Sequence, residues 1–535
     1  MNKDKMRIIP LGGLGEVGKN MMVYEYEDDI LIVDTGMMFP ESDMLGVDYI
    51  IPDFNYLMDK INRVRGIVLT HGHEDHVGAL SHVLESINAP IYATPLTRGL
   101  AEVKLARAGL LQKADLRTVQ AGDTVQIASF KVDFFHVCHS IPDGVGLGIE
   151  TPAGLVVHSG DYKFDHTPVD NWPSDYARLA SFSRRGVLAL LSDSTNAERA
   201  GWTPSEKVID SALDMVFRKA PGRIIIATFA SLISRMQQAA NAAIHYGRKL
   251  AFVGPSMTDN LKMARKLGYL DIPDDLMVPL DQALAMKDKE VVLMCTGAQG
   301  EPASILGRLS TGTNRMFDLK PGDTVLLSSH PIPGNEEAVY KTINRLFQRG
   351  AEVIYEAVAP VHVSGHASQE EMKLLMHLVR PRYFIPIHGE LRMLRQHAKL
   401  AEDVGILREN IAVVQNGTVI EVSEAGMQIG ERLPGGYVFV NGSVVEDMDR
   451  SVMRERENLA RDGAVSVSAV ISGGRVRSVA VQTKGVNLTD EAENGLRTRL
   501  YELSGATQAA AEQLIRTYIY NDLRRRPALF VTIHE

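Results

Sequence analysis

The sequence predicts an α/β protein of several domains: a layered, sheet-rich first domain, a parallel α/β domain inserted into it, and a small α+β domain at the C-terminal end. Three observations predict this order. Histidines and carboxylates crowd residues 71–76, directly after a buried strand; alternating helices and buried strands begin near residue 205; and histidine motifs return between residues 362 and 388. Because histidine motifs flank the middle block on both sides, we interpret that block as an insertion.

The length of 535 residues also favours several domains, since one compact core rarely extends so far. We assign the first domain to residues 1–204 and 362–446, and the inserted domain to residues 205–361. A highly charged stretch at 447–464 is expected to be a linker, and residues 465–535 to form the last domain.

The first domain opens with apolar runs at 6–11, 21–26 and 30–33, and the polar pair at 28–29 predicts a hairpin between the second and third. Helical periodicity and strand patterns then follow in turn: helices at 78–87 and 96–108, and strands at 66–70, 124–127, 130–138 and 155–158.

The inserted domain alternates helix and buried strand, which is typical of a parallel sheet. Its expected helices are at 205–219 and 234–246, and its expected strands at 223–228, 250–253, 291–296 and 323–328. The last domain is expected to contain two strands, two helices and a closing strand at 529–533.

The composition is ordinary for a globular protein, with 45% hydrophobic and 23% charged residues. Residues 1–13 lack the apolar core of a signal peptide, and apolar runs such as 187–191 are too short to span a membrane, so we expect a cytosolic protein with no membrane partner. The net charge of −9 argues against coating nucleic acid through overall charge, but permits a locally basic channel. Cys138 and Cys295 lie in apolar, strand-like runs, which predicts buried free thiols.

A glycine motif near the N-terminus raises the possibility of a dinucleotide site. Residues 13–18 fit G-x-G-x-x-G after a strand, and Asp34 ends a later strand. Residues 20–33, however, have the pattern of a β-hairpin, so no helix N-terminus is available for a pyrophosphate. We therefore favour a glycine-rich turn between strands.

The strongest signal is the segment Thr70–His76, in which three histidines and two carboxylates follow a buried strand and precede a helix expected to begin near Val77. Burying these groups together would be costly without partners, and metal binding removes that cost. The first two histidines project the same way from an extended segment, while the aspartate and the last histidine come from the following turn. Two adjacent metals can therefore share the loop. An exposed histidine cluster without a role is the disfavoured alternative.

The spacing H-x-H-x-D-H is similar to the signature of the metallo-β-lactamase superfamily. That resemblance implies an αββα sandwich and further ligands at later strand ends, where the sequence offers His139, Asp161 and His388. It implies that His71, His73 and His139 hold one metal and that Asp75, His76 and His388 hold the other, with Asp161 bridging. Asp34 matches a further acidic motif, and we expect it to orient the histidine loop.

Imidazoles and carboxylates suit two Zn²⁺ ions per subunit, although Mn²⁺ or Mg²⁺ stays open. Two such ions can activate water and brace the attacking and leaving oxygens of a phosphodiester.

Later motifs resemble those of the β-CASP nucleases: Ser192–Asn196, His362–Ser368 and Pro386–Glu390. Within that group, three segments are similar to the ribonuclease J family: His139–Asp143, Ser328–Glu336 and Arg524–Pro527. The resemblance extends from Leu11 to the C-terminus without a departure at a ligand position. It implies an inserted β-CASP domain and a metal-dependent ribonuclease that works 5′→3′ from monophosphorylated ends, also cuts internally, and acts in RNA maturation and decay.

Small residues in the second of these motifs leave backbone N–H groups open to a phosphate. We take the catalytic candidates to be Asp75, Asp193 and His366, the last stabilising the scissile phosphate or protonating the leaving oxygen. Alternatively, Asp193 is a structural carboxylate, and His366 is a turn histidine that caps the next helix. The candidate substrate contacts are Phe229, Ala230, Ser231, Arg235, His362, Val363, Ser364, Gly365, His366, Ala367 and Ser368.

The family resemblance further implies single-stranded RNA as partner, self-association as a homodimer or homotetramer, and a place in an RNA-degradation assembly. It also suggests a structural Ca²⁺ near Gly46 and Asp48.

Two other functions stay open: a small-molecule thioesterase or lactamase, and an inactive RNA-binding or scaffold protein. The long insertion disfavours the first, and seven filled ligand positions disfavour the second. A flavo-diiron oxidoreductase is disfavoured because that family has Glu where this chain has His73.

Overall fold

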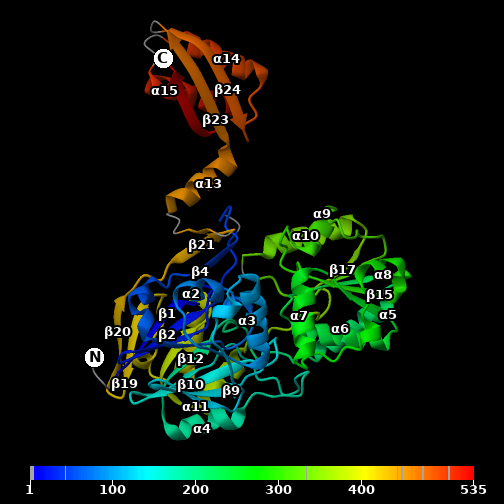
Figure 1. Ribbon diagram of the computed structural model, residues 1–535, viewed down its shortest axis with the longest axis vertical. Coiled ribbons are helices and arrows are strands. Elements are labelled where there is room, and N and C mark those ends of the chain that lie inside the picture. The colour runs from blue at the N-terminus through cyan, green and yellow to red at the C-terminus, as the bar shows by residue number, and fades with distance from the viewer. Residues whose placement is uncertain are drawn as a thin grey trace. The chain divides into compact units, whose positions relative to one another are not determined.

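The computed structural model describes residues 5–41, 44–332, 334–442, 444–446, 450–472, 475–503 and 507–534. The chain divides into two compact units (Figure 1). One comprises Met1–Phe39 and Tyr49–Val438, and the other Pro40–Asp48 and Phe439–Glu535. The first unit contains the predicted insertion and most of the predicted first domain, but not its residues 40–48 and 439–446. The Pro40–Asp48 segment clusters with the C-terminal unit, which the sequence pattern did not indicate.

Two mixed sheets form the sandwich. The eight-stranded sheet has the order β20-β19-β1-β2-β3-β5-β6-β7. Its strands are β1 (Met6–Gly12), β2 (Met21–Tyr26), β3 (Asp29–Val33), β5 (Val64–Val68), β6 (Ile91–Ala93), β7 (Leu116–Thr118), β19 (Thr418–Ser423) and β20 (Gly426–Arg432). The six-stranded sheet has the order β18-β12-β11-β10-β9-β8. Its strands are β8 (Thr124–Ile127), β9 (Phe130–His136), β10 (Val145–Thr151), β11 (Gly154–His158), β12 (Val187–Asp193) and β18 (Pro381–Ile387).

Apolar side chains join the two sheets face to face, among them Tyr24 and Val68 from the first sheet and Phe134 and Leu191 from the second. Helices cover the outer faces. On the first sheet lie α1 (Glu74–Val77), α2 (Leu80–Ser86) and α3 (Pro95–Arg107). On the second lie α4 (Tyr176–Arg185), α11 (Gln369–Val379) and α12 (Leu391–Asp403). The predicted αββα sandwich is confirmed.

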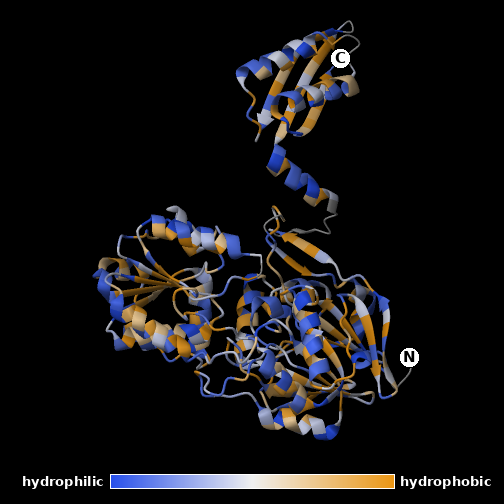
Figure 2. Ribbon diagram, turned by 180° about the vertical axis from the view of Figure 1, so that it is seen from behind, coloured by the Kyte–Doolittle hydropathy of each residue, from blue (hydrophilic) through white to orange (hydrophobic). Residues whose placement is uncertain are grey.

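The inserted domain is a five-stranded sheet of order β14-β15-β13-β16-β17, and all its neighbouring strands are parallel. The strands are β13 (Ile224–Ala227), β14 (Lys249–Phe252), β15 (Val291–Cys295), β16 (Thr324–Leu327) and β17 (Glu352–Ile354). One face packs on α5 (Val208–Lys219), α6 (Ile233–His245) and α7 (Pro255–Lys266), and the other on α8 (Leu280–Ala285), α9 (Ile305–Thr311) and α10 (Glu336–Gln348). Figure 2 shows these strands coloured hydrophobic between two-toned helices, as expected for strands buried on both faces.

Two details near the N-terminus bear on the sequence predictions. β2 and β3 pair antiparallel as a hairpin, so the glycine motif at 13–18 is a turn between strands and the dinucleotide alternative is excluded. The helix expected near Val77 begins earlier, at Glu74, because the extended His73 directly precedes the first helical turn. Asp75 and His76 therefore lie on this turn.

In the C-terminal unit, β23 (Ala464–Ser472) pairs antiparallel with β24 (Arg475–Lys484) and parallel with β25 (Ala528–His534). The helices α14 (Asp490–Tyr501) and α15 (Gln508–Leu523) pack on this sheet through an apolar core. The strand and helix order is the one the sequence predicts. The expected linker at 447–464 contains the helix α13 (Arg450–Asp462), and its residues 447–449 lie outside the described part of the chain.

The short strands β4 (Tyr49–Pro52), β21 (Tyr437–Asn441) and β22 (Val444–Glu446) complete the set of described strands. Within the described residues, no helix has both the length and the apolar character needed to cross a bilayer. Cys138 and Cys295 are buried free thiols, as predicted, and burial raises the pKa of Cys295 to about 12.

Candidate metal centre

The candidate ligands follow strands that end at one edge of the sandwich. His71 and His73 come after β5, His139 after β9, Asp161 after β11, and His388 after β18. β11, β12 and β18 are parallel neighbours, so the chain leaves all three at the same edge. Residues separated by more than 300 positions in sequence are thereby brought together.

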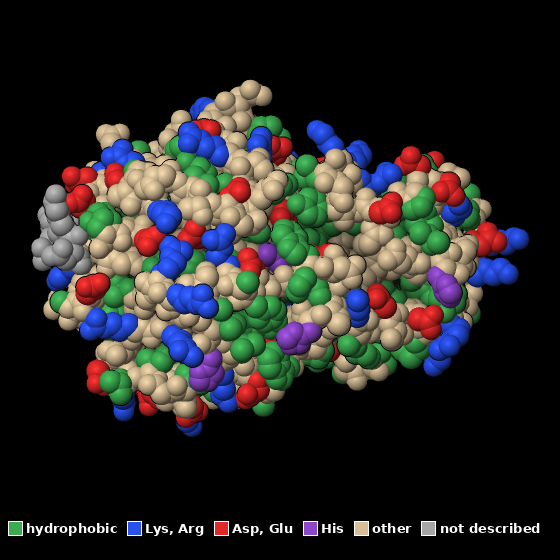
Figure 3. Space-filling model, turned by 90° about the horizontal axis from the view of Figure 1, so that it is seen from below, with side chains coloured by type: hydrophobic (Ala, Val, Ile, Leu, Met, Phe, Trp, Pro, Cys, Tyr) green, Lys and Arg blue, Asp and Glu red, His purple; other side chains and the backbone are tan. Residues whose placement is uncertain are grey.

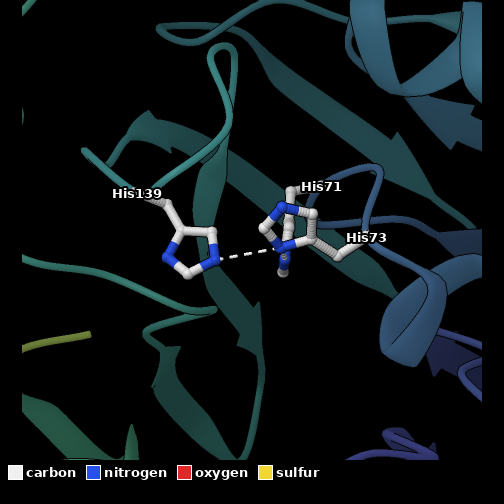
Figure 4. A group of neighbouring side chains, drawn as sticks. All are labelled: His71, His73 and His139. Atoms are coloured by element: carbon white, nitrogen blue, oxygen red, sulfur yellow. Dashed lines mark hydrogen bonds between the residues drawn. The ribbon is translucent and has the colours of Figure 1, made fainter. Parts of the chain in front are cut away.

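Three imidazoles form the first group (Figure 4). Nδ1 of His73 lies 3.1 Å from Nε2 of His71 and 3.1 Å from Nε2 of His139. Burial lowers the pKa of His73 to about 4, and burial with neighbouring imidazoles lowers those of His71 and His139 well below the usual value. Three neutral nitrogens that converge in this way form a ligand set for a divalent cation.

Asp75, His76, Asp161 and His388 form the second group. Nε2 of His76 lies 3.1 Å from Oδ2 of Asp161, and Nδ1 of His388 lies 2.8 Å from Oδ1 of Asp161. Asp75 Oδ2 is 3.6 Å from His76 Nε2 and 3.4 Å from His388 Nε2. Although burial alone would lower the pKa of His388, Asp161 and the other carboxylates raise it to about 10. The carboxylates therefore make this end of the site negatively charged, which favours a bound cation.

Asp161 lies between the two groups. Its Oδ2 is 3.7 Å from Nε2 of His71 and 3.8 Å from Nε2 of His139, in addition to its contact with His76. This is the position that a bridging carboxylate requires.

The donor set fits a pair of divalent cations. Imidazole and carboxylate ligands suit zinc and related metals. In the described part of the chain, the buried Nε2 of His388 makes no hydrogen bond, although Oδ2 of Asp75 lies 3.4 Å away, and such an atom is costly to bury unless something binds it. The second ligand group therefore fits a cation better than it fits an ordinary polar interior.

Further contacts orient the ligands. Oδ2 of Asp34 accepts hydrogen bonds from Nδ1 of His76 (2.7 Å) and from Oγ1 of Thr70 (2.8 Å). Asp34 holds this position with a left-handed backbone, at a φ of 63°. Nδ1 of His139 donates to the carbonyl oxygen of Gly365 at 2.7 Å. Such partners fix the ring that faces a metal.

Sequence reasoning missed Asn20, whose Nδ2 lies 3.1 Å from Nε2 of His76 and donates to the backbone oxygen of Asp75. An asparagine after a glycine-rich turn offers no local pattern to reveal such a contact. It is recognised only once the turn and the histidine loop are in place.

His366 and Asp193 form a pair beside the metal-ligand groups. Nδ1 of His366 lies 2.8 Å from Oδ2 of Asp193, and the histidine side chain is 19% exposed. Burial opposes the charged imidazole, but Asp193 and Asp161 raise the pKa of His366. Asn196, the last residue of the Ser192–Asn196 motif, donates to Oγ of Ser364 and to the backbone oxygen of His366, contacts that the sequence did not predict.

Other predicted substrate contacts occupy distinct environments. Val363 and Ala367 have buried apolar side chains. Ser368 is buried as the N-cap of α11 in a capping box with Glu371, so the helix cap considered for His366 is provided by Ser368. His362 lies beside His330 with nearly parallel rings, and burial, followed by Arg235, lowers its pKa to about 3.

The loop after β13 was also expected to contact substrate. Phe229, Ala230 and Ser231 are partly exposed there. Arg235, expected to assist in phosphate binding, has a side chain that is only 1% exposed, and its guanidinium bonds to Glu206, Gln238, Ser328 and Val361. Arg235 therefore lies in the interior, and its guanidinium donors are taken up by protein partners.

The residues suggested for calcium lie in the C-terminal unit. Oδ2 of Asp48 accepts a hydrogen bond from the backbone N–H of Gly442 at 2.7 Å, and Nη1 of Arg456 donates to the backbone oxygen of Gly46 at 3.1 Å. In the described ranges, Asp48 belongs to none of the groups of three or more metal-ligating side chains.

Comparisons with known families agree with this fold. The description "Metallo-beta-lactamase superfamily" matches residues 14–194, "Ribonuclease J, beta-CASP domain" matches 221–346, and "Zn-dependent metallo-hydrolase RNA specificity domain" matches 350–413. The fold and the site thus define a metallo-β-lactamase-type hydrolase with an inserted β-CASP domain.

Similar proteins include Ribonuclease J of Synechocystis sp. (44% identity, 90% of this chain and 76% of the relative) and Ribonuclease J of Thermus thermophilus (44%, 88% and 83%). Ribonuclease J2 of Bacillus subtilis is 38% identical over 100% of this chain and 99% of its own length. The chain belongs to the ribonuclease J family, a family of metal-dependent ribonucleases.

A solved Enterococcus faecalis protein described as of unknown function shares the fold, with a TM-score of 0.55 and 14% identity. It covers 78% of this chain and 100% of its own.

Proposed function

We propose that this chain hydrolyses RNA at two divalent cations, most suitably Zn²⁺, held by the two ligand groups. His71, His73 and His139 would hold one ion, and Asp75, His76 and His388 the other, with Asp161 shared. The observation that carries the proposal is the position of Asp161, whose carboxylate lies within 4 Å of imidazoles of both groups. Bound cations of this kind supply an activated water at neutral pH and neutralise phosphate charge.

His366 is proposed to contact the scissile phosphate or to protonate the leaving oxygen. Asp193 engages its Nδ1, which leaves Nε2 as the ring nitrogen that can meet substrate. Asp193 would then fix the tautomer and the orientation of the ring. Asp75 would hold a cation on the side of the site where its own carboxylate is 31% exposed.

Ser364 and Gly365 are proposed to bind a phosphate of the RNA through hydroxyl and backbone N–H groups, together with the exposed loop Phe229–Ser231. Figure 3 shows Lys and Arg side chains interspersed with Asp and Glu side chains on the lower face, so positive side chains are available there despite the net charge of −9. The preferred reaction is 5′→3′ degradation from a 5′-monophosphate, with internal cleavage in addition.

The test compares RNAs that carry a 5′ hydroxyl, a monophosphate or a triphosphate, in the presence of zinc, manganese or magnesium. We expect metal-dependent cleavage that is fastest on the monophosphate. Asp161→Ala and His73→Ala should lose about 10⁴-fold or more in rate while staying folded. The surface variant His377→Ala serves as the control. Undiminished RNA cleavage by the first two variants, or hydrolysis of a chromogenic lactam in place of RNA, would remove the proposal.

Several finer points follow from family membership. We propose self-association as a homodimer or homotetramer, which light scattering would measure. A cytosolic location, a role in RNA maturation and decay, partners in an RNA-degradation assembly, and a structural Ca²⁺ near Gly46 and Asp48 stay predictions of the same kind.

A further inference from the structure

A buried group of charges connects the sandwich, both connecting segments and the inserted domain. It consists of Lys163, Glu206 and Arg235, whose side chains are 1%, 6% and 1% exposed. Lys163 follows β11 in the sandwich, Glu206 lies in the segment that leaves the sandwich, and Arg235 lies on α6 of the inserted domain. We call these three residues the relay.

Lys163 holds the outgoing and returning segments to the sandwich. Its ammonium donates to the backbone oxygens of Pro204 and Ser364, each at 3.3 Å, and to Oε1 of Glu206 at 3.5 Å. These acceptors match the three N–H bonds of an ammonium group. Pro204 belongs to the outgoing segment, and Ser364 to the returning one.

Arg235 continues the connection into the inserted domain. Its Nη2 donates to Oε2 of Glu206 at 3.0 Å, and its Nη1 donates to the backbone oxygen of Val361 at 2.8 Å and to Oγ of Ser328. Ser328 follows β16 and itself donates to Val361 at 2.7 Å. The returning segment is therefore fixed at Val361 and Ser364, on both sides of His362.

The position of Ser364 makes the relay relevant to the reaction. Oγ of Ser364 accepts from Asn196 at 2.8 Å and from the backbone N–H of His366 at 3.2 Å, and the next carbonyl, that of Gly365, accepts from His139. A shift of the Ser364 backbone would therefore be transmitted both to His366 and to a candidate metal ligand.

Stability alone does not explain the relay. Buried ion pairs contribute little net stability, because desolvation offsets their attraction. The two cations here face the carboxylate of Glu206, and Lys163 also lies 3.9 Å from Oδ2 of Asp165. Their donors are instead directed at the backbone of both connecting segments. This arrangement fixes the positions of the two connecting segments.

We propose that Lys163, Glu206 and Arg235 are positioning residues for RNA cleavage, which hold the Ser364–His366 loop in place at the metal centre and couple that loop to the inserted domain. The proposal rests on the role proposed above for Ser364 and His366.

Arg235→Lys tests the proposal, because lysine keeps the charge but cannot reach Glu206, Val361 and Ser328 together. With 5′-monophosphorylated single-stranded RNA, kcat should fall at least about tenfold and KM should change less than about threefold, since a small displacement at the reacting centre is costly to rate. Bound metal per subunit should stay as in the wild type.

Arg223→Lys is the matched control. Arg223 is 2% exposed in the same domain, and it bonds to Asp323 and to the backbone oxygen of Asp318, away from both connecting segments. Its Tm should fall about as much as that of Arg235→Lys, while its kcat stays within about twofold of the wild type. Equal losses of kcat in the two variants, or full kcat in Arg235→Lys, would overturn the proposal.

A milder variant covers the case in which Arg235→Lys does not fold. Ser328→Ala removes a hydroxyl that bonds to Arg235 of the relay and to Val361, and kcat should fall about threefold with KM nearly unchanged. Wild-type kcat in folded Ser328→Ala, together with unfolded Arg235→Lys, would show a purely structural relay and overturn the proposal.

A double variant separates this proposal from the function on which it rests. If the relay acts through the loop, Arg235→Lys should slow His366→Ala by a clearly smaller factor than it slows the wild type. Additive losses would overturn the relay and leave the role of His366 intact. Full activity of His366→Ala alone would overturn the role of the loop, and the relay with it.

Discussion

His76 and Asp34 form a short contact behind the candidate metal centre: Nδ1 of the imidazole lies 2.7 Å from Oδ2 of the carboxylate. The other ring nitrogen, Nε2, faces Asp161 at 3.1 Å. Nδ1 thus holds the orientation of the ring, and Nε2 is the nitrogen that can bind a metal.

This contact predicts the effect of Asp34→Asn. The amide keeps the shape of the side chain but loses the negative charge that fixes the ring, so metal affinity should fall about 10- to 100-fold. Competition with a chromogenic chelator would measure the affinity. Unchanged affinity in a folded variant would show that Asp34 serves only the backbone of Thr70, to which it also bonds.

Variants of His366 and Asp193 should separate an effect on the rate of cleavage from an effect on metal binding. His366→Ala is expected to lower kcat for RNA cleavage about 10²- to 10⁴-fold, which is the usual contribution of a positioned acid or base. Asp193→Asn should lower it less, because the amide oxygen can still accept a hydrogen bond from Nδ1 of the ring. Metal content, measured by atomic emission, should be unchanged in His366→Ala. A loss of metal in that variant would make His366 a ligand.

Gly365→Ala should damage the site through a steric clash alone. A Cβ at Gly365 would lie 2.5 Å from the ring of His139 and 2.7 Å from the backbone nitrogen of Ser140. Because the ring must move, we expect at least a tenfold loss of about equal size in metal affinity and RNA cleavage. Gly436→Ala is the control, since a Cβ there meets nothing within 4 Å. Equal activity of the two variants would contradict the tight contact.

Removal of metal should lower stability as well as activity. A ligand that binds only the folded state stabilises it by about 4 kcal/mol at a free concentration 1,000 times its Kd. Chelation should therefore lower the Tm and abolish RNA cleavage, and readdition of zinc should restore both. The Asp161→Ala variant should show almost no change of Tm on chelation. A large chelator effect in that variant would place the bound metal elsewhere.

His397 should make stability depend on pH. Its Nδ1 lies 3.0 Å from Oγ of Ser194, its Nε2 has no partner among the described residues, and burial lowers its pKa from 6.5 to about 3. The fold therefore favours the neutral ring, so this contribution to stability is complete above pH 6.5 and is lost as the pH falls towards 3.

From pH 7 to pH 5 the loss should be about 2 kcal/mol. The free energy of unfolding of the metal-free protein, measured in urea, should fall between pH 7 and pH 5 by about 2 kcal/mol more in the wild type than in His397→Gln. Parallel slopes would mean that His397 accepts a proton in the fold.

The sequence alone identified the strands and motifs that depend on local pattern. Alternating apolar residues predicted the β2–β3 hairpin, and the buried runs of the insertion predicted a parallel sheet, because burial on both faces demands continuous apolar strands. The crowding at Thr70–His76 predicted a metal site, because no other partner compensates such a cluster. The helix α13 was not predicted, since a strongly charged segment has little apolar periodicity to reveal a helix.

Tertiary structure decided which residues face the site and which do not. Arg235 follows an exposed loop in sequence, yet it lies in the interior with four protein partners; Asn20 has no motif, yet it contacts His76. Local sequence determines where a strand runs and which groups need compensation. Whether a side chain meets substrate, a metal or another part of the chain depends on packing between segments hundreds of residues apart, and that information is absent from any local pattern.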